Sequence, residues 1–286
     1  MTIDNFIPEI WAAGVAQALQ DNSVLAPLFA SQYEGEARKG NQVHITGVIP
    51  PPVNNYATGA GGNPRTTVAE DIDDDGDTIL INQEKSFDFF VDDIDRTQAA
   101  GSFDSWTTAA GRALGEDADT YIAAQAFAGG TDATAVVNDG APVETAEHAW
   151  NCLRDLRKEA NKAKVSMGDR VAVMNAEFEA LLLANDAKLT SVDTSGTPQA
   201  LREAILGRLL GMTLVVCNFL PENDEPAVFM AWRPALAYVS QMDTVEGMRH
   251  HEKFADRIRG LHVYGGKVLT VAGYDAGVQY YLPSGS

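Results

Sequence analysis

Cations and cysteines are both scarce in this chain of 286 residues. The sequence has 21 Lys and Arg residues against 40 Asp and Glu residues, which gives a formal net charge of −19 at pH 7. Proteins that bind nucleic acid directly do so with clustered cations that displace the counterions of the phosphates. The charge balance therefore argues against direct nucleic-acid binding.

The two cysteines, Cys152 and Cys217, lie in segments that read as a helix and a buried strand. Neither a disulfide framework nor a cysteine-based zinc site is therefore predicted. No apolar run approaches the ~18 residues of a membrane-spanning helix. The first residues also lack the basic and apolar regions of an export signal. We expect a soluble protein of a reducing compartment, with no membrane partner.

Catalytic motifs are incomplete. The sequence has no HExxH or GxSxG pattern, and the neighbours His250 and His251 cannot easily share one face of a helix or strand. One segment resembles a phosphate loop, with Gly260, Gly265, Gly266 and Lys267. It has one inserted residue, and Val268 replaces the hydroxyl residue that would hold magnesium. No catalytic residue, cofactor-binding residue or cofactor is predicted, and no enzyme activity.

An acidic segment matches part of a calcium loop. Positions one, three, five and six are occupied by Asp71, Asp73, Asp75 and Gly76. Position twelve, which requires a bidentate acid, is Asn82, and a strand follows where a helix is needed. We expect a solvated acidic loop and no metal site. A metal-dependent hydrolase that uses residues 71–77 is an alternative.

Residues 102–130 predict one long helix around which the rest of the chain is arranged. The expected buried face recurs at three- and four-residue steps: Trp106, Ala110, Ala113, Leu114, Asp117, Tyr121, Ala124 and Phe127. Gly129 and Gly130 suit a left-handed C-cap. At ~1.5 Å per residue, roughly 25 residues span about 38 Å. We expect this helix to lie across a domain, with small side chains that let a sheet approach closely.

The N-terminal part predicts an amphipathic helix over residues 4–20. A short apolar patch follows, broken by Pro27. It consists of Val24, Leu25, Leu28 and Phe29.

Residues 34–83 are strand-like at both ends and rich in Pro, Gly and acidic residues between them. We expect residues 40–77 to bury little apolar surface in their own subunit. A long segment without a core predicts a two-stranded arm that reaches another molecule; an unstructured linker is the alternative. The apolar residues Ile79, Ile81, Phe87, Phe89 and Val91 then occupy odd positions, which predicts one half-buried strand that leads into the long helix.

Helices alternate with apolar strands after residue 130, which indicates a layered α/β unit. The predicted helices cover residues 145–163, 176–184 and 201–210, and the predicted strands cover residues 170–174, 214–217 and 227–230. Two further strands, at residues 254–271 and 278–282, are expected to complete a sheet beside the long helix.

Five short sequence elements occur in order along the chain. They are FIPEIW at residues 6–11, YEGE at 33–36, FDFFVDD at 87–93, RVAVMN at 170–175 and FADRIRGLHVYG at 254–265. Together they resemble the major capsid proteins of tailed bacteriophages, whose fold is shared with encapsulins and the herpesvirus capsid floor. The last element is the most specific, because several of its residues agree at fixed spacing.

The resemblance implies an α+β fold with five parts. These are an N-terminal arm or helix (1–33), an extended two-stranded loop (34–85), a peripheral domain with a spine helix (86–130), an axial α/β domain (131–249) and C-terminal strands that return to the peripheral domain (250–286).

The resemblance also implies a structural coat protein of the virion. Its subunits would form the hexamers and pentamers of an icosahedral head, assembled in the host cytoplasm around double-stranded DNA that is bound without sequence specificity. Implied partners are scaffolding, portal and decoration proteins. Lys39 and Lys85 lie only near the base of the loop, so covalent crosslinking is not predicted. An encapsulin-like compartment shell is the alternative within the same fold.

The charge predicts how assembly responds to salt. Each subunit carries −19, so raising the ionic strength from 0.01 to 0.1 M shortens the Debye length from ~30 to ~10 Å and should promote assembly of free subunits. Light scattering of subunits titrated with sodium chloride should rise. Scattering that falls would mean that ion pairs between subunits outweigh the net repulsion.

Overall fold

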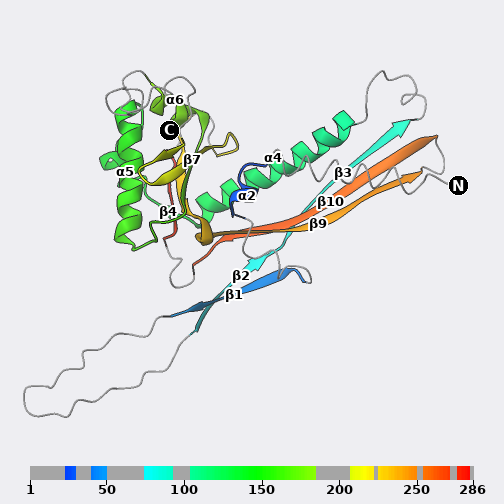
Figure 1. The fold of residues 1–286 in the computed structure, drawn as a ribbon, viewed down its shortest axis with the longest axis horizontal. Helices are drawn as coiled ribbons and strands as arrows, with labels where there is room; N and C mark the ends of the chain where they lie inside the picture. The colour runs from blue at the N-terminus through cyan, green and yellow to red at the C-terminus, as the bar shows by residue number, and fades with distance from the viewer. Residues whose placement is uncertain are drawn as a thin grey trace, which may run out of the picture.

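The computed structural model describes residues 23–29, 40–49, 74–92, 104–184, 207–221, 225–249, 254–270 and 276–283. The predicted helix at residues 4–20 and the predicted tip of the arm lie outside these ranges. Two β-sheets and the long helix α4 (Asp104–Gly129) form the body, and a two-stranded hairpin projects from it (Figure 1). None of the described helices is both long enough and apolar enough to cross a bilayer.

Helix α4 confirms the predicted long helix, but its buried face is rotated by about one residue from the expected one. Its covered positions include Gly111, Gly115, Ala118, Ile122 and Ala126. One residue turns an α-helix by about 100°, so this shift moves the buried face by more than a quarter of a turn around the helix. The sequence pattern missed the face because glycine has no apolar side chain to count, although it allows the closest approach.

Trp106 was expected on the buried face of α4 and is 66% exposed. It lies in the first turn of the helix, whereas the α4 residues of the main core begin at Ala118. The prediction of a buried Trp106 is therefore wrong for the single subunit. The side chain projects where the described part of the subunit offers no core to cover it.

The glycines at the end of α4 serve close packing instead of a left-handed cap. Neither Gly129 nor Gly130 has a positive φ. A Cβ atom on Gly129 would lie 2.9 Å from the Cβ of Val268, and one on Gly130 would lie 2.4 Å from the carbonyl oxygen of Ala126. Both distances are too short for a side chain, so glycine is required here by contact and not by backbone conformation.

Six strands form the sheet at one end of α4 (Figure 1). Their order is β4 (Thr131–Asp132), β11 (Val278–Tyr281), β8 (Val228–Trp232), β5 (Arg170–Met174), β7 (Met212–Val216) and β6 (Arg208–Leu209). The pairs β4–β11 and β5–β7 are parallel and the other pairs are antiparallel. The sheet is covered on both faces, because Val171 and Val173 of β5 join the core with α4 while Ala172 and Met174 join the core under α5.

Helices α5 (Ala146–Lys162) and α6 (Ala176–Leu182) confirm two predicted helices. The apolar face of α5 is fully buried: Ala149, Cys152, Leu153, Leu156 and Ala160. Thr145 and Asn175 are the N-caps, and each accepts a hydrogen bond from the backbone three residues later. Two 3-10 turns, η1 (Val137–Gly140) and η2 (Arg233–Ala235), connect the strands and helices.

The helix predicted at residues 201–210 is wrong at its C-terminal end, since residues 208–209 form strand β6. Residues 201–206 lie outside the described ranges. Leu210 and Gly211 have φ values of 50° and 78°, which suit a tight hairpin turn and interrupt a helix. The apolar pair Leu209 and Leu210 fits either structure by pattern alone.

Three antiparallel strands form the second sheet, in the order β3 (Gln83–Asp92), β10 (Ala255–Val268) and β9 (Leu236–Arg249). Helix α4 lies along this sheet, and the Tyr121 hydroxyl donates a hydrogen bond to the carbonyl of Gly266 at 3.3 Å (Figure 1). The strand predicted from Ile79 to Val91 is interrupted at residues 81–82, so its two halves belong to different sheets.

The expected sheet membership of the last strands needs correction. Strand β10 lies beside α4 as expected, but β11 joins the six-stranded sheet by pairing with β8 and β4. Strand β9, within residues 131–249, belongs to the three-stranded sheet with β3 and β10. Both corrections concern pairing between distant segments, which apolar patterns do not specify.

The hairpin of β1 (Gln42–Val48) and β2 (Asp74–Leu80) confirms that the two predicted flanks pair with each other. Contrary to expectation, the base of this hairpin buries apolar side chains within its own subunit. Val43, Ile45 and Ile79 are buried against three residues of the body: Ala237, Val239 and Leu269. The hairpin is therefore fixed at its base. A short helix, α2 (Ala26–Phe29), packs on α4 and includes Pro27 in its first turn.

The rotation of α4 predicts which of its side chains stabilise the subunit. Ile122→Ala should lower the free energy of unfolding by about 2–5 kcal/mol, because it leaves a cavity in the main core. Trp106→Ala should change it by less than about 0.5 kcal/mol, as for other exposed positions. Urea denaturation of the unassembled subunit measures both, and equal losses would show that the assigned face is wrong.

Candidate assembly surfaces

Asp119 of α4 fixes the segment that precedes α2. Its carboxylate is fully buried and accepts hydrogen bonds from the Ser23 hydroxyl at 2.8 Å and from the backbone of Val24 at 2.7 Å. The backbone N–H groups of Leu25 and Ala26 also donate to it, at 3.0 and 3.3 Å. One carboxylate thus satisfies the free N–H groups at the start of a helix, and Leu25 and Phe29 enter the main core.

Asp77 of β2 ties the base of the hairpin to the end of β10. It forms an ion pair with Lys267, and its second oxygen accepts hydrogen bonds from the backbone and hydroxyl of Thr270 at 3.2 and 3.3 Å. Burial alone would raise the pKa of this carboxyl group. The hydrogen bonds from Lys267, Thr270 and Thr78 outweigh that effect and lower its pKa.

The two incomplete motifs of the sequence therefore meet in one structural contact. Lys267, from the phosphate-loop pattern, lies in strand β10, and Asp77, from the acidic run, lies in strand β2. Gly265 is needed because a Cβ atom there would lie 2.1 Å from the carbonyl oxygen of Leu80. Asp75 and Gly76 are also in β2, which excludes the turn that a calcium loop requires. Asp71 and Asp73 lie outside the described residues.

A second polar group joins α4 to the three-stranded sheet. Asp117 accepts a hydrogen bond from the Tyr264 hydroxyl and lies 3.3 Å from the ammonium of Lys85. Burial raises the pKa of Tyr264, and the negative charge of Asp117 raises it further. Close by, His262 is buried, with its Nε2 2.9 Å from the Ser240 hydroxyl, and burial lowers its pKa. Lys85 thus has a role within its own subunit.

The face of the three-stranded sheet away from α4 exposes apolar side chains. Phe90, Arg257 and Met248 lie side by side on the three strands, and the guanidinium of Arg257 is 5.5 Å from the centre of the Phe90 ring. Arg257 also pairs with Asp88. Four large apolar residues on this sheet or next to it are exposed: Phe90, Met248, Phe254 and Leu261. They are candidates for contact with another protein molecule.

The two cysteines are the remaining candidate residues that the structure describes. Cys152 and Cys217 are buried and unpaired with each other. Burial raises the pKa of the Cys152 thiol well above its usual value and raises that of Cys217 to about 11. His250 and His251 lie outside the described residues. Within the described ranges no cluster of three or more His, Cys, Asp and Glu side chains could hold a metal.

These surfaces suit a structural subunit, and comparison with known proteins agrees. The sequence profile of a family described as phage capsid protein matches residues 78–279. The chain belongs to this family. It is a structural capsid protein of the virion, and a structural family of this kind implies a non-enzymatic role.

Solved capsid structures show the same fold. The structure titled Mycobacterium phage Che8 is 43% identical, with a TM-score of 0.79 over 91% of this chain and 90% of that chain. The capsid of cyanophage P-SCSP1u is 16% identical, with a TM-score of 0.71 over 92% and 89%. A virus-like particle from Pyrococcus furiosus is 13% identical, with a TM-score of 0.60 over 96% and 98%. At these lower identities only the fold is shared. No curated protein matches the chain.

The family match confirms the fold and the general function that the resemblance implied. The tailed-phage capsid fold is present, and the encapsulin-like alternative is not favoured, because the more similar relative is a phage protein. The sequence pattern did not identify Asp119, or the roles of Asp117 and Lys267. Single carboxylates carry no motif, and their partners lie far away in sequence.

The anchor at Asp77 predicts a pH-dependent contribution to stability. Asp77→Asn removes the charge that Lys267 binds and should lower the free energy of unfolding at pH 7 by about 1.5–3 kcal/mol. Because the folded-state pKa lies below the ordinary 3.8, the difference from wild type should persist above that value and vanish as the pH falls through the folded pKa.

Urea denaturation over a pH series measures this difference. Asp75→Asn, two residues earlier on the same strand and more exposed, is the matched control and should differ little from wild type. A loss that is equal for both variants would show that the carboxylate of Asp77 contributes no specific anchor.

Proposed function

We propose that this capsid protein forms the hexamers and pentamers of an icosahedral phage head that encloses double-stranded DNA. The observation that supports this most directly is the β1–β2 hairpin. It is fixed to the body at its base by Asp77 and Lys267, and it projects from the body (Figure 1). An arm that contacts a second copy makes a heterologous contact, and heterologous contacts close into rings.

We assign the parts of the fold as follows. The N-terminal arm covers residues 1–33 and the extended loop residues 34–85. The peripheral domain consists of α4 with the sheet of β3, β9 and β10, and the axial domain consists of the six-stranded sheet with α5 and α6. This division amends the one expected from the sequence, because it follows the sheets and not the order along the chain.

The exposed apolar patch on the three-stranded sheet is the proposed contact for a neighbouring subunit. Phe90, Met248 and Leu261 are 54%, 42% and 45% exposed, which is unfavourable unless another molecule covers them. Arg257 and Arg259, which are held by Asp88 and Glu246, add polar groups between these apolar side chains.

Further partners follow from this role. Scaffolding and portal proteins would start and complete the shell, and a decoration protein would bind its outside, with assembly in the host cytoplasm. DNA would be enclosed without sequence-specific binding. We do not propose crosslinking through Lys39 or Lys85, and Lys85 lies 3.3 Å from Asp117 of its own subunit.

Shortening the arm tests the proposal. Replacement of residues 49–73 by Asn-Gly joins Val48 to Asp74, which are paired in the hairpin, by a two-residue turn. The variant should unfold at the same temperature as wild type, because the buried residues of the hairpin are retained. It should form no shells, since the contact with the next subunit is removed.

Electron microscopy of wild type and variant, purified in parallel, measures shell formation, and circular dichroism measures folding. Closed particles from a folded short-arm variant would show that the arm is not the contact that joins neighbouring subunits. Absence of particles from the wild-type protein alone at any salt concentration would show that the subunit does not assemble without a scaffolding protein.

A further inference from the structure

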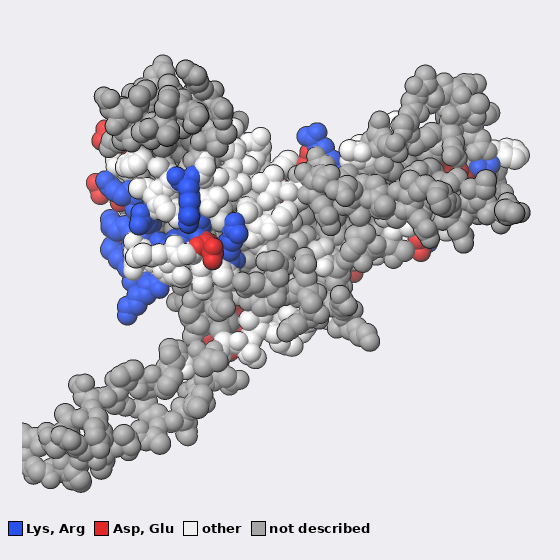
Figure 2. Space-filling model, in the orientation of Figure 1, with Lys and Arg blue, Asp and Glu red and all other residues white. Residues whose placement is uncertain are grey.

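Cations gather along one face of α5, although the chain as a whole carries a net charge of −19 (Figure 2). Steps of three and four residues place them on the same side of the helix, over about 12 Å. With one polar and one apolar neighbour they line a groove of about 570 Å³: Arg154, Arg157, Lys158, Asn161, Lys162 and Leu210. Leu210 comes from the turn after β6, so the groove lies between α5 and the sheet edge.

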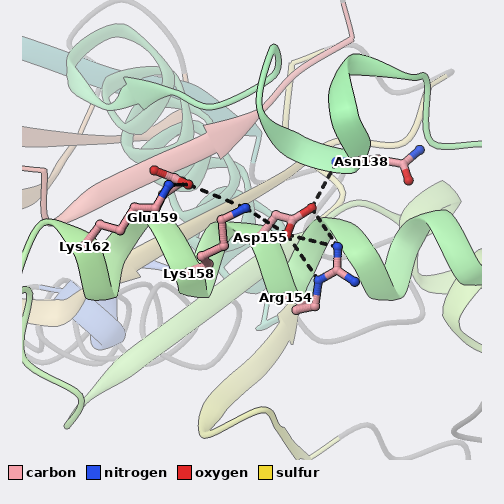
Figure 3. A network of polar contacts seen from close by, with 6 residues as sticks. All are labelled: Asn138, Arg154, Asp155, Lys158, Glu159 and Lys162. Carbon is pink, nitrogen blue, oxygen red and sulfur yellow. Dashed lines mark hydrogen bonds and ion pairs between the residues drawn. The ribbon is translucent and has the colours of Figure 1, made fainter.

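The carboxylates of this cluster lie beneath the cations. Asp155 accepts hydrogen bonds from Arg154 at 3.1 Å and lies 3.6 Å from the ammonium of Lys158, and Glu159 is 2.7 Å from Lys162 (Figure 3). The side chains of Asp155 and Glu159 are 4% and 23% exposed, whereas those of the three cations are 56%, 51% and 61% exposed. A molecule that enters the groove therefore meets the cations.

Asp155 is also fixed from its other side. The backbone N–H of Asn138, in the 3-10 turn η1, donates a hydrogen bond to its Oδ2 at 3.2 Å (Figure 3). The carboxylate is thus held in place by backbone and by side chains together. It orients Arg154 and Lys158 toward the groove and is itself unable to turn outward without losing these bonds.

Two arginines carry uncompensated positive charge in or near the groove, and of the two only Arg157 lines it. Arg157 forms no ion pair with any residue in the described ranges. Arg170 is 2% exposed and contacts Asn161 of the groove. Among the described residues, its guanidinium donates to neutral acceptors alone: the carbonyls of Val165 and Ser166, and the side chain of Asn161 at 2.9 Å. Burial and the charge of Arg157 both lower the pKa of Arg170. An anion in the groove would relieve this repulsion.

We propose that the α5 groove binds phosphate groups of the nucleic-acid backbone, and that the subunit contacts enclosed DNA there without reading its sequence. This inference rests on the proposed function and names the surface that meets the DNA. Four cations lie within about 12 Å, three of them exposed and Arg157 partly exposed, so several can approach the phosphates of duplex DNA, which carries one charge per ~1.7 Å of its axis. Arginine and lysine are also the residues that proteins use to bind phosphate.

A carboxylate surface of a second copy fits the groove less well. Carboxylates on the three-stranded sheet are bound within their own subunit, Asp88 by Arg257, Glu246 by Arg259 and Asp256 by Arg249. They would have to give up these pairs to reach another α5. Phosphates of DNA need give up only mobile counterions, which favours binding at low salt.

Fluorescence anisotropy of a labelled 20-base-pair duplex, titrated with unassembled full-length subunits, tests the proposal. For four phosphate contacts, raising the salt from 50 to 200 mM should weaken binding about 150-fold. Arg157→Gln with Lys162→Gln leaves two contacts, so the same change in salt should weaken binding only about 12-fold. At 50 mM salt this double variant should also bind at least tenfold more weakly than wild type.

Arg112→Gln with Arg249→Gln is the matched control, because it removes the same charge from exposed sites on α4 and β9. The control should bind like wild type, and thermal unfolding verifies that both variants are folded. Equal weakening of both variants, or no weakening of the α5 variant, would overturn the proposal. So would binding of poly-glutamate in place of the duplex, which would assign the groove to an acidic protein segment.

Duplex binding by unassembled subunits is measured separately from shell formation, so the two proposals can fail independently. Shells seen by electron microscopy for a wild-type protein that binds no duplex would overturn this inference and leave the proposed function intact. Duplex binding that depends on the α5 cations, from subunits that form no shells, would support the groove and contradict the proposed function.

Discussion

One hydrophobic core, shared by α4 and both sheets, is the constraint on which the rest of the structure depends. Ile122 and Ala126 of α4 meet Val171 and Phe229 of the six-stranded sheet in the same cluster that contains Tyr264 of the three-stranded sheet. Because the two sheets share these contacts, neither can shift without disturbing the other. Small residues on α4 make this possible, since both sheets must approach the helix closely. The buried Asp119 then adds α2 to the same unit.

The hairpin depends on that unit for its own position. Its base packs on Ala237 and Leu269, and the pair of Asp77 and Lys267 fixes it where β10 ends. Gly265 is required at the crossing, because any side chain would collide with the backbone of Leu80. A segment held in this way at one end transmits the orientation of the body to whatever its tip contacts. That property suits a subunit whose neighbours must be placed at defined angles.

Net charge and local charge lead to different conclusions about this protein. The value of −19 describes repulsion between whole subunits, while a ligand at α5 meets only the residues within a few ångströms. Asp155 and Glu159 count toward the total but are less exposed than Arg154 and Lys162, with which they pair. The excess of acidic residues therefore describes the average surface and not the residues that line this groove.

The sequence by itself determined the local elements and the family. Periodicity located α4, α5 and β5 because each buries a face whose spacing follows from helix or strand geometry. The ordered short elements identified the capsid fold, since they depend on identity at fixed spacing. Only the tertiary structure decided the phase of α4, the exposure of Trp106, the sheet to which β9 and β11 belong, and the pairing of Asp77 with Lys267. These features depend on contacts between distant segments, and no local pattern encodes which surfaces will meet.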